Sequence, residues 1–341
     1  MDTMKTLICA VILVGSASPL FSQTTDSSAY FYQKGMEEKT AKRYLVASQN
    51  FDKAIRLNPK YTAAYIENGN VNLEMRRTDA ARLNFTKAND LEPGNPVVMG
   101  ALVNLYYDYR QYQAALEMAQ KCATCSNAAR IIALSYFHLD DYGKSEKLLK
   151  QVPKYQEDAE IQYALGRTYM EMELTTKAIP YYEKALKLDE TKGTWAFELG
   201  LLYYTAEKYK DAVISFNNAT AHGYPKSNEF NENLGYAYLY SGEYDKGEQM
   251  LLDVHSRIRG NKDIYRDLAE VYYNRKLYDK SLEYCQKIME IDIKDGKALY
   301  QAGLCFQKKG EKERGQQMCD KAIELDPSLR GLRIKKQISG L

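Results

Sequence analysis

The sequence predicts an all-α protein built as a linear array of helical hairpins. A pattern of small and apolar residues recurs about every 34 residues between residues 28 and 327. Within each copy the apolar residues follow the three- and four-residue spacing of amphipathic helices. Glycine and proline contribute only 20 and 8 of the 341 residues, which is too few for a loop-rich β-sandwich. Together these observations favour a repeat protein made only of helices.

Residues 1–22 differ from the rest of the chain and are typical of a secretory signal peptide. A positive charge and an apolar run over residues 7–14 precede several small residues. The run is shorter than the roughly 18 apolar residues that span a membrane. We therefore expect cleavage near Ser22 or Gln23, followed by a short linker over residues 23–27. The mature chain should be exported to the periplasm or cell envelope of a Gram-negative bacterium, and it should contain no transmembrane segment.

Each copy of the repeat has two slots for small residues, twelve positions apart. The first slot holds Gly35, Gly69, Val103, Ala133, Gly166, Gly200, Gly235, Ala269 and Gly303. The second holds Ala47, Ala81, Ala115, Ser145, Ala178, Ala212, Gly247, Ser281 and Gly315. A bulky residue follows four positions later, as in Phe51, Phe85, Tyr182 and Phe216. We interpret each copy as two antiparallel helices that cross closely at the small residues, with aromatic rings filling the gaps between neighbouring copies.

This order of Leu-Gly, Tyr, Ala, Phe, Ala and Pro over 34 residues resembles the tetratricopeptide repeat. The second copy carries the pattern most fully, in Tyr65, Gly69, Ala81, Phe85, Ala88 and Pro93. The resemblance covers nine copies over residues 28–327. It implies an α-solenoid, a right-handed superhelix of helix-turn-helix repeats whose first helices line a concave groove, with a C-terminal capping helix over residues 328–341. Members of this family usually bind proteins or peptides and are seldom enzymes.

The third copy is irregular, because it is only 30 residues long and has Cys122 where alanine is expected. We expect residues 119–128 to form a shortened second helix that changes the curvature of the array locally. The resulting organisation is residues 28–125 for repeats 1–3 and residues 126–327 for repeats 4–9. The junction between them is either a hinge or a compact turn.

The sequence contains no recognisable catalytic, metal-binding or phosphate-binding motif. His138, His222 and His255 are isolated from one another and from any cysteine at ligand spacing. A net charge of +2 gives no general attraction to nucleic acid. We therefore predict a protein that is not an enzyme, that needs no cofactor or metal, and that does not bind nucleic acid.

Five cysteines follow the predicted signal peptide. Cys122 and Cys125 have the spacing of a redox motif but lack the βαβ setting that such motifs need. We expect buried, unpaired thiols, since free cysteine is among the most buried residues. The alternatives are a local Cys122–Cys125 disulfide and a Cys285–Cys305 disulfide, whose helices should touch, with Cys319 as a competing partner.

The first helices carry a second stripe of residues, displaced by one position from the core stripe, where a solvated face should be polar. It is instead rich in aromatic and cationic residues: Tyr32, Tyr107, Arg130, Phe137, Tyr163, Arg167, Phe197, Tyr204, Tyr236, Arg266, Tyr273 and Tyr300. We call these twelve residues the stripe. Tyrosine and arginine are enriched at binding hot spots, so the stripe is predicted to line the groove and bind the partner. The alternative is that these aromatic residues thicken the hairpin core.

These observations favour a scaffold or adaptor of the envelope that binds a protein or peptide partner. The alternative is a module for glycans or another non-protein ligand, because tyrosine-rich surfaces also suit sugar rings. If the stripe binds the partner without supporting the fold, replacing Tyr163, Arg167, Tyr204 and Arg266 together should abolish binding and leave the melting temperature nearly unchanged.

Overall fold

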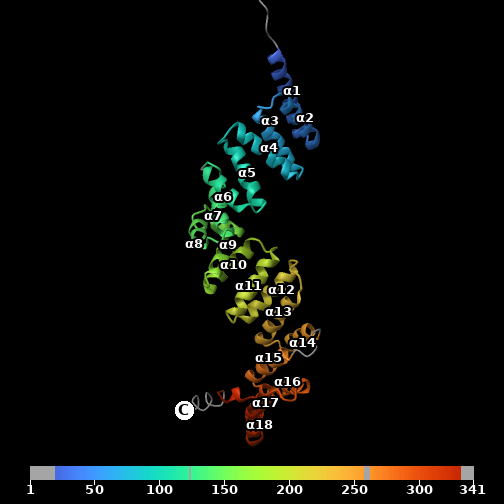
Figure 1. Cartoon of the computed structure of the whole chain (residues 1–341), viewed down its shortest axis with the longest axis vertical. Coiled ribbons are helices and arrows are strands. Elements are labelled where there is room, and N and C mark those ends of the chain that lie inside the picture. Colours follow the sequence, from blue (N-terminus) through green and yellow to red (C-terminus); the bar gives the residue numbers. More distant parts are fainter. Residues whose placement is uncertain (1–19, 123, 257–261, 332–341) are drawn as a thin grey trace, which may run out of the picture. The chain divides into compact units, whose positions relative to one another are not determined.

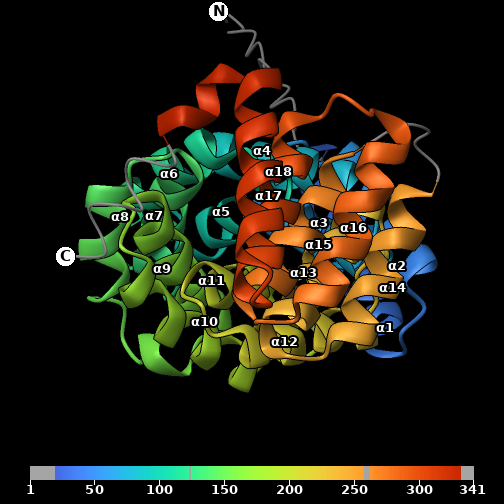
Figure 2. The same cartoon turned by 90° about the horizontal axis from the view of Figure 1, so that it is seen from below.

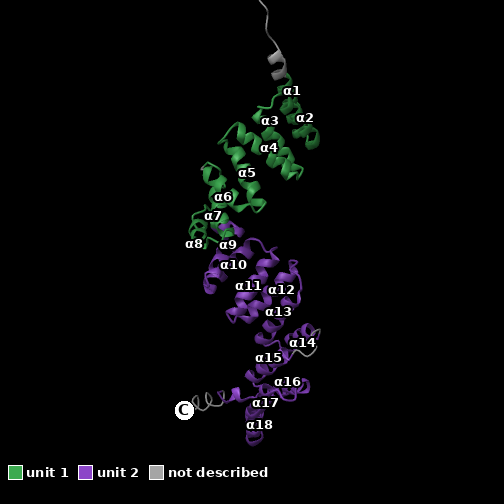
Figure 3. Ribbon diagram, in the orientation of Figure 1, with its two compact units in different colours: residues 1–155 green, residues 156–341 purple. Residues whose placement is uncertain are grey.

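The computed structural model describes residues 20–122, 124–256 and 262–331, and this part of the chain is all-α (Figure 1). It contains eighteen α-helices, which pair in sequence order as nine hairpins. The predicted fold class is therefore confirmed. The chain divides into two compact units, residues 1–155 and 156–341 (Figure 3). None of the described helices combines the length and the apolar composition that crossing a bilayer requires.

The first unit holds four hairpins, each made of a first and a second helix. They are α1 (Leu20–Thr40) with α2 (Tyr44–Leu57), α3 (Thr62–Glu74) with α4 (Thr78–Leu91), α5 (Pro96–Asp108) with α6 (Tyr112–Lys121), and α7 (Ala128–His138) with α8 (Tyr142–Leu149). A short 3-10 turn, η1 (Tyr155–Glu157), follows α8.

The second unit holds five hairpins and a terminal 3-10 turn. They are α9 (Ala159–Glu171) with α10 (Thr175–Leu188), α11 (Gly193–Thr205) with α12 (Tyr209–Ala221), α13 (Asn228–Ser241) with α14 (Tyr244–His255), α15 (Asp263–Asn274) with α16 (Tyr278–Ile291), and α17 (Gly296–Lys308) with α18 (Lys312–Leu325), followed by η2 (Pro327–Leu329). The two helices of a hairpin pack against each other, as α17 and α18 do. Figure 2 shows the chain from below, with this last hairpin at the front.

The two helices of a hairpin meet where a small residue of the first helix faces a bulky side chain of the second. A Cβ added at Gly69 would lie 2.7 Å from Cζ of Phe85, and one added at Gly200 would lie 2.6 Å from Cδ1 of Phe216. Glycine is needed because each ring occupies the space of a Cβ. Phe216 also contacts the ring of Phe230 in the next copy, at a centroid distance of 5.9 Å. The rings therefore fill gaps between copies, as expected, but they pack first against the glycine of their own copy.

Two copies without glycine in the first slot carry a residue smaller than phenylalanine or tyrosine sixteen positions later. Val103 faces a helix with Ala119 at this position, and Ala133 faces one with Leu149. All four residues are buried. In these two copies a larger residue in the first slot is thus matched by a smaller partner on the second helix.

The turn inside each hairpin requires a residue in the left-handed region. Gly242 and Gly310 supply it in two turns, with φ of 99° and 98°. Seven other turns place a non-glycine residue there: Lys42, Arg76, Arg110, Asp140, Glu173, Glu207 and Lys276. An L-residue in this region costs roughly 1–2 kcal/mol relative to its preferred conformation.

Arg76→Gly is therefore expected to raise the free energy of unfolding by about 0.5–1 kcal/mol. Arg76 is exposed and has a φ of 56°, so the glycine relieves strain, and only part of the gain is offset by its larger unfolded-state entropy. The matched control is Arg82→Gly, at an exposed position inside α4, where glycine should cost about 1 kcal/mol. Urea unfolding of the two variants should give shifts of opposite sign; equal losses would contradict the explanation.

The second helices of the third and fourth copies are shorter than the others. α6 has 10 residues and α8 has 8, whereas the other second helices have 12 to 14. The division between the compact units lies at residues 155 and 156, one hairpin beyond the short third copy. The shortened segment is thus internal to the first unit.

Both predicted terminal segments lie largely outside the described residues. The signal peptide of residues 1–22 overlaps them only at the start of α1, which begins at Leu20. Of the predicted capping helix, Leu329 is buried against Tyr300 and Ile323. Residues 332–341, which form the rest of that prediction, are outside the described part of the chain.

Candidate functional site

The stripe is not uniformly exposed. Phe197 and Tyr300 are only 7% and 6% exposed and belong to hydrophobic core clusters of the second unit. Phe197 is covered by Tyr224, whose ring stacks on it at a centroid distance of 4.3 Å. For these two residues the alternative of a core role describes the structure better. The other ten are half-buried: Tyr32, Tyr107, Arg130, Phe137, Tyr163, Arg167, Tyr204, Tyr236, Arg266 and Tyr273.

In the first unit, stripe residues contact aromatic groups of neighbouring elements. The ring of Tyr32 lies 5.0 Å from that of Tyr61, which precedes α3. Tyr107 Oη lies 3.2 Å from Nε2 of His138 on α7. The imidazole of His138 in turn stacks on Tyr112, with 4.0 Å between the ring centroids. The stripe here forms aromatic contacts between successive hairpins.

In the second unit, Glu198 joins α9, α10 and α11. Its carboxylate accepts hydrogen bonds from the hydroxyl groups of Tyr182 at 2.7 Å and Tyr163 at 3.4 Å. Nη1 of Arg167 donates to it at 3.3 Å. Tyr163 also stacks on Trp195, at 4.6 Å between centroids. Burial, followed by the negative charge of Glu198, raises the pKa of Tyr163, so this phenol stays protonated and donates.

An aromatic cluster continues this arrangement over α11, α12 and α13. The ring of Tyr204 lies 5.5 Å from that of Tyr209 and 6.1 Å from that of Tyr240. The hydroxyl group of Tyr236 on α13 donates to Asp267 on α15. Burial and this hydrogen bond raise the pKa of Tyr236. Neighbouring first helices are therefore linked by stripe side chains along the second unit.

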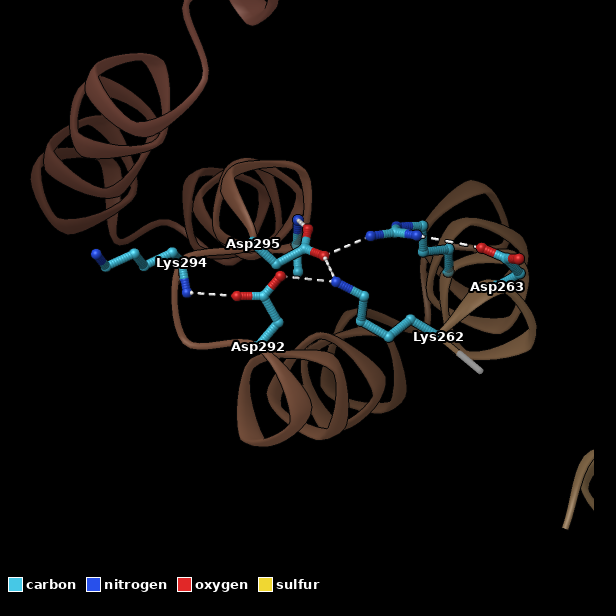
Figure 4. A network of polar contacts seen from close by, with 7 residues as sticks. Lys262, Asp263, Asp292, Lys294 and Asp295 are labelled. Carbon is cyan, nitrogen blue, oxygen red and sulfur yellow. Dashed lines mark hydrogen bonds and ion pairs between the residues drawn. The ribbon is translucent and has the colours of Figure 1, made fainter. Parts of the chain in front are cut away.

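An ion-pair network links α15 to the start of α17 (Figure 4). Nζ of Lys262 lies 2.8 Å from Asp292 and 2.9 Å from Asp295, and Arg266 also donates to Asp295. The second carboxylate oxygen of Asp295 accepts from the backbone N–H of Ala298 at 3.0 Å and so caps α17. Burial alone would raise the pKa of Asp295, but its hydrogen bonds and the nearby cations outweigh burial and lower it.

These contacts correct one expectation about the stripe. Tyr163, Arg167 and Arg266 form bonds between neighbouring hairpins. Replacing these three residues and Tyr204 in one variant would therefore remove structural bonds as well as surface groups. Such a variant is expected to lose stability. A test of binding must therefore use positions where substitution preserves these contacts.

Sequence reasoning missed the acidic residues that accept these bonds. Glu67, Glu198 and Asp267 each lie two positions before the first small-residue slot of their copy. Each accepts a hydrogen bond from the preceding first helix, donated by Lys39, Arg167 and Tyr236, respectively. The acidic residues at this one repeat position in three copies were the feature of the sequence that could have indicated these acceptors. In the ninth copy the equivalent residue is Gln301.

A pocket of about 400 Å³ opens among α15, α16 and α17. This volume lies within the roughly 300–1,000 Å³ typical of ligand sites. Its apolar lining consists of Ala269, Cys285, Ile288, Ala298, Tyr300 and Leu329. Its polar lining consists of Arg266, Glu270, Lys297 and Gln301. The pocket thus includes two stripe residues, Arg266 and Tyr300.

The cysteines are divided between a disulfide and buried thiols. Cys122 and Cys125 are joined by a disulfide, whereas Cys285, Cys305 and Cys319 are free and buried. Burial raises the pKa of the Cys285 thiol to about 12, which leaves it protonated at neutral pH. Across the described residues, no group of three histidine, cysteine or acidic side chains gathers as a metal site would require.

Family models described as tetratricopeptide repeat match residues 159–192, 232–298 and 296–329. The first segment covers α9 and α10, and the other two cover α13 to α18 almost completely. Residues 159–192 and 232–329 are tetratricopeptide repeats. The resemblance inferred from the small-residue slots and aromatic positions is thereby confirmed.

Two curated relatives match parts of these repeats. Human protein O-mannosyl-transferase TMTC1 is 29% identical over 160 residues, which is 47% of this chain and 18% of that protein. Anaphase-promoting complex subunit 3 of Schizosaccharomyces pombe is 29% identical over 166 residues, 47% of this chain and 25% of that protein. The chain therefore matches a quarter or less of the length of these relatives.

Two solved structures are similar to parts of the chain at low sequence identity. PilW, described as a widely conserved type IV pilus biogenesis factor, is 18% identical with a TM-score of 0.46, covering 61% of this chain and 97% of PilW. The Cut9–Hcn1 assembly of the anaphase-promoting complex is 16% identical with a TM-score of 0.40, covering 82% of this chain and 52% of the matched chain.

Proposed function

We propose that this tetratricopeptide repeat protein is a non-enzymatic scaffold or adaptor that binds a protein or peptide on the first-helix surface of its second unit. The observation that carries the proposal is the set of half-buried stripe residues from Tyr163 to Tyr273, held in place by contacts between neighbouring first helices and ending at a pocket. Side chains that are already ordered lose little entropy on binding, which favours affinity.

The non-enzymatic character is supported by the chemistry of the described side chains. Burial raises the pKa of Cys285 to about 12 and also raises that of Tyr163, so neither group is activated as a nucleophile. The export part of the proposal rests on residues 1–22, whose composition is typical of a signal peptide. We therefore place the scaffold in the envelope of a Gram-negative bacterium.

The proposal is tested by photo-crosslinking in cells with p-benzoylphenylalanine in place of Tyr273. This half-buried aromatic residue lies on the stripe, and an aromatic substitute keeps its ring contact with Tyr278. The matched control places the same crosslinker at Ile214, a residue 66% exposed on the second helix α12. We expect a protease-sensitive adduct from position 273 and none from position 214.

Two results would contradict the proposal. Equal adduct yields at both positions would indicate contact without a preferred surface. An adduct at position 273 that resists protease and is removed by glycosidases would favour the alternative of a glycan-binding module.

A further inference from the structure

We propose that the pocket among α15, α16 and α17 receives one branched apolar side chain of a peptide, while main-chain carbonyl oxygens of that peptide accept hydrogen bonds from Arg266 and Gln301. The inference rests on the function proposed above and specifies the partner chemistry at one end of the stripe. The proposed ligand of the pocket is a neutral peptide segment and not an anionic small molecule.

Two buried hydrogen-bond donors at the pocket lack acceptors in the part of the chain that the structure describes. Nε of Arg266 and Nε2 of Gln301 are buried, and neither has a hydrogen-bond partner among the described residues. Both residues line the pocket. A buried donor without an acceptor destabilises the folded state, so two of them at one pocket call for an explanation. A bound carbonyl group supplies the missing acceptor after small adjustments of these half-buried side chains.

Three other repeats carry an acidic acceptor at the position that Gln301 occupies. The residue two positions before the first slot accepts a bond from the preceding first helix in Glu67, Glu198 and Asp267. At the last junction this position holds Gln301, and Arg266 of the preceding first helix donates instead to Asp295. The acidic acceptor found at three other junctions is thus absent from this one, and donors from both helices remain for a ligand.

The charges around the pocket are balanced. Arg266 and Lys262 are matched by Asp295 and Asp292 within the same network (Figure 4). The two exposed charges of the lining, Lys297 and Glu270, are of opposite sign. A carboxylate therefore gains little net attraction here, whereas a neutral amide oxygen can accept the free N–H groups without adding charge.

The apolar lining determines the side chain that fits. Ile288, Ala298 and Leu329 present aliphatic carbon to the pocket. A leucine or isoleucine side chain would bury apolar surface against them, and alanine would leave most of the volume unfilled. The expected anchor is therefore a branched aliphatic residue flanked by ordinary peptide bonds.

The test is methyl NMR on the full chain with labelled isoleucine and alanine methyl groups. The probes are N-acetyl-leucine methylamide, N-acetyl-alanine methylamide and 4-methylpentanoate. We expect the leucine amide to shift the Ile288 and Ala298 methyl signals, with an affinity at least about five-fold higher than that of either other probe. No shift with the leucine amide, or tighter binding of 4-methylpentanoate, would overturn the proposal.

A variant separates ligand binding from folding. Gln301→Met keeps the side-chain length but removes the unpaired donor, so it should leave the melting temperature unchanged or raise it. The same change should weaken the leucine amide about five-fold. The matched control, Gln286→Met at an exposed position of α16, should alter neither quantity. Unchanged affinity in Gln301→Met would also overturn the proposal.

The two proposals fail in distinguishable ways. If the probes do not bind but the crosslink at position 273 persists, the peptide-anchor inference is wrong and the scaffold function stands. If the probes bind the pocket but no adduct forms at position 273, the pocket accepts a peptide group while the stripe as a whole is not the partner surface.

Discussion

Phe216→Ala is expected to lower the free energy of unfolding of the second unit by about 3–5 kcal/mol. Phe216 is fully buried, and its ring lies against Gly200 and Phe230. Removing it leaves a cavity that neither the glycine of its own hairpin nor the next copy can fill. The only tryptophan, Trp195, lies on α11 of the same hairpin, so its fluorescence during urea unfolding reports on this region directly.

The matched control for Phe216 is Ile214→Ala on the same helix. Ile214 is 66% exposed, so its truncation should change stability by less than about 1 kcal/mol. A loss in Phe216→Ala no larger than that of the control would contradict the packing described for the hairpin.

The glycine partner gives a complementary result. In Gly200→Ala the new Cβ would lie 2.6 Å from the Phe216 ring, so overpacking should cost about 1–3 kcal/mol. Combining it with Phe216→Leu reproduces the Ala133 and Leu149 pair of the fourth copy. The double variant should therefore lose less free energy of unfolding than the two single variants lose together. Equal losses would contradict direct contact between the two side chains.

The second large effect is expected at Glu248. Its carboxylate accepts hydrogen bonds from the hydroxyl groups of Tyr272 and Tyr284 and from Lys280, the last at 2.9 Å. These bonds tie α14 to α15 and α16. Glu248→Gln keeps the shape but removes the charge, and it is expected to lower the free energy of unfolding at pH 7 by about 2–3 kcal/mol. The control is Glu290→Gln, at an exposed position of α16, which should change it by less than about 0.5 kcal/mol.

Glu248 also makes stability depend on pH. Burial by itself raises its pKa, but the hydrogen bonds from Tyr272, Tyr284 and Lys280 outweigh burial and lower it. An unfolded glutamate has a pKa of about 4.3, so over the interval below this value the folded state binds fewer protons than the unfolded state. The contribution of Glu248 is therefore fully present above about pH 5 and is lost as the pH falls through the folded-state pKa.

The pH dependence can be measured by urea unfolding between pH 3 and pH 7. The wild-type chain should lose stability steeply below about pH 4, because the pKa of Asp295 is lowered as well. Glu248→Gln should show a shallower slope in the same interval, since one contributing group no longer titrates. Parallel curves for the two proteins would show that Glu248 does not contribute.

Much of the hairpin architecture could be predicted because each helix crossing leaves a local trace in the sequence. Gly69 and Gly200 recur at one repeat position because a ring of the second helix occupies the space of their Cβ. The partners of the stripe could not be predicted in the same way. Glu198 receives its hydrogen bonds from α9 and α10, while it lies on α11, and a single helix does not record which side chains of the preceding copy reach it.

The sequence by itself determined the helical class, the nine-fold repetition and the residues at which the helices of a hairpin cross, because helix periodicity and close packing act within one copy. Only the tertiary structure decided which stripe residues remain at the surface. Tyr204 and Phe197 lie on the same predicted stripe of α11, yet Tyr204 is half-buried and Phe197 is covered by Tyr224 and Phe230. The physical reason is that the burial of a first-helix side chain depends on the side chains that the next hairpin places against it.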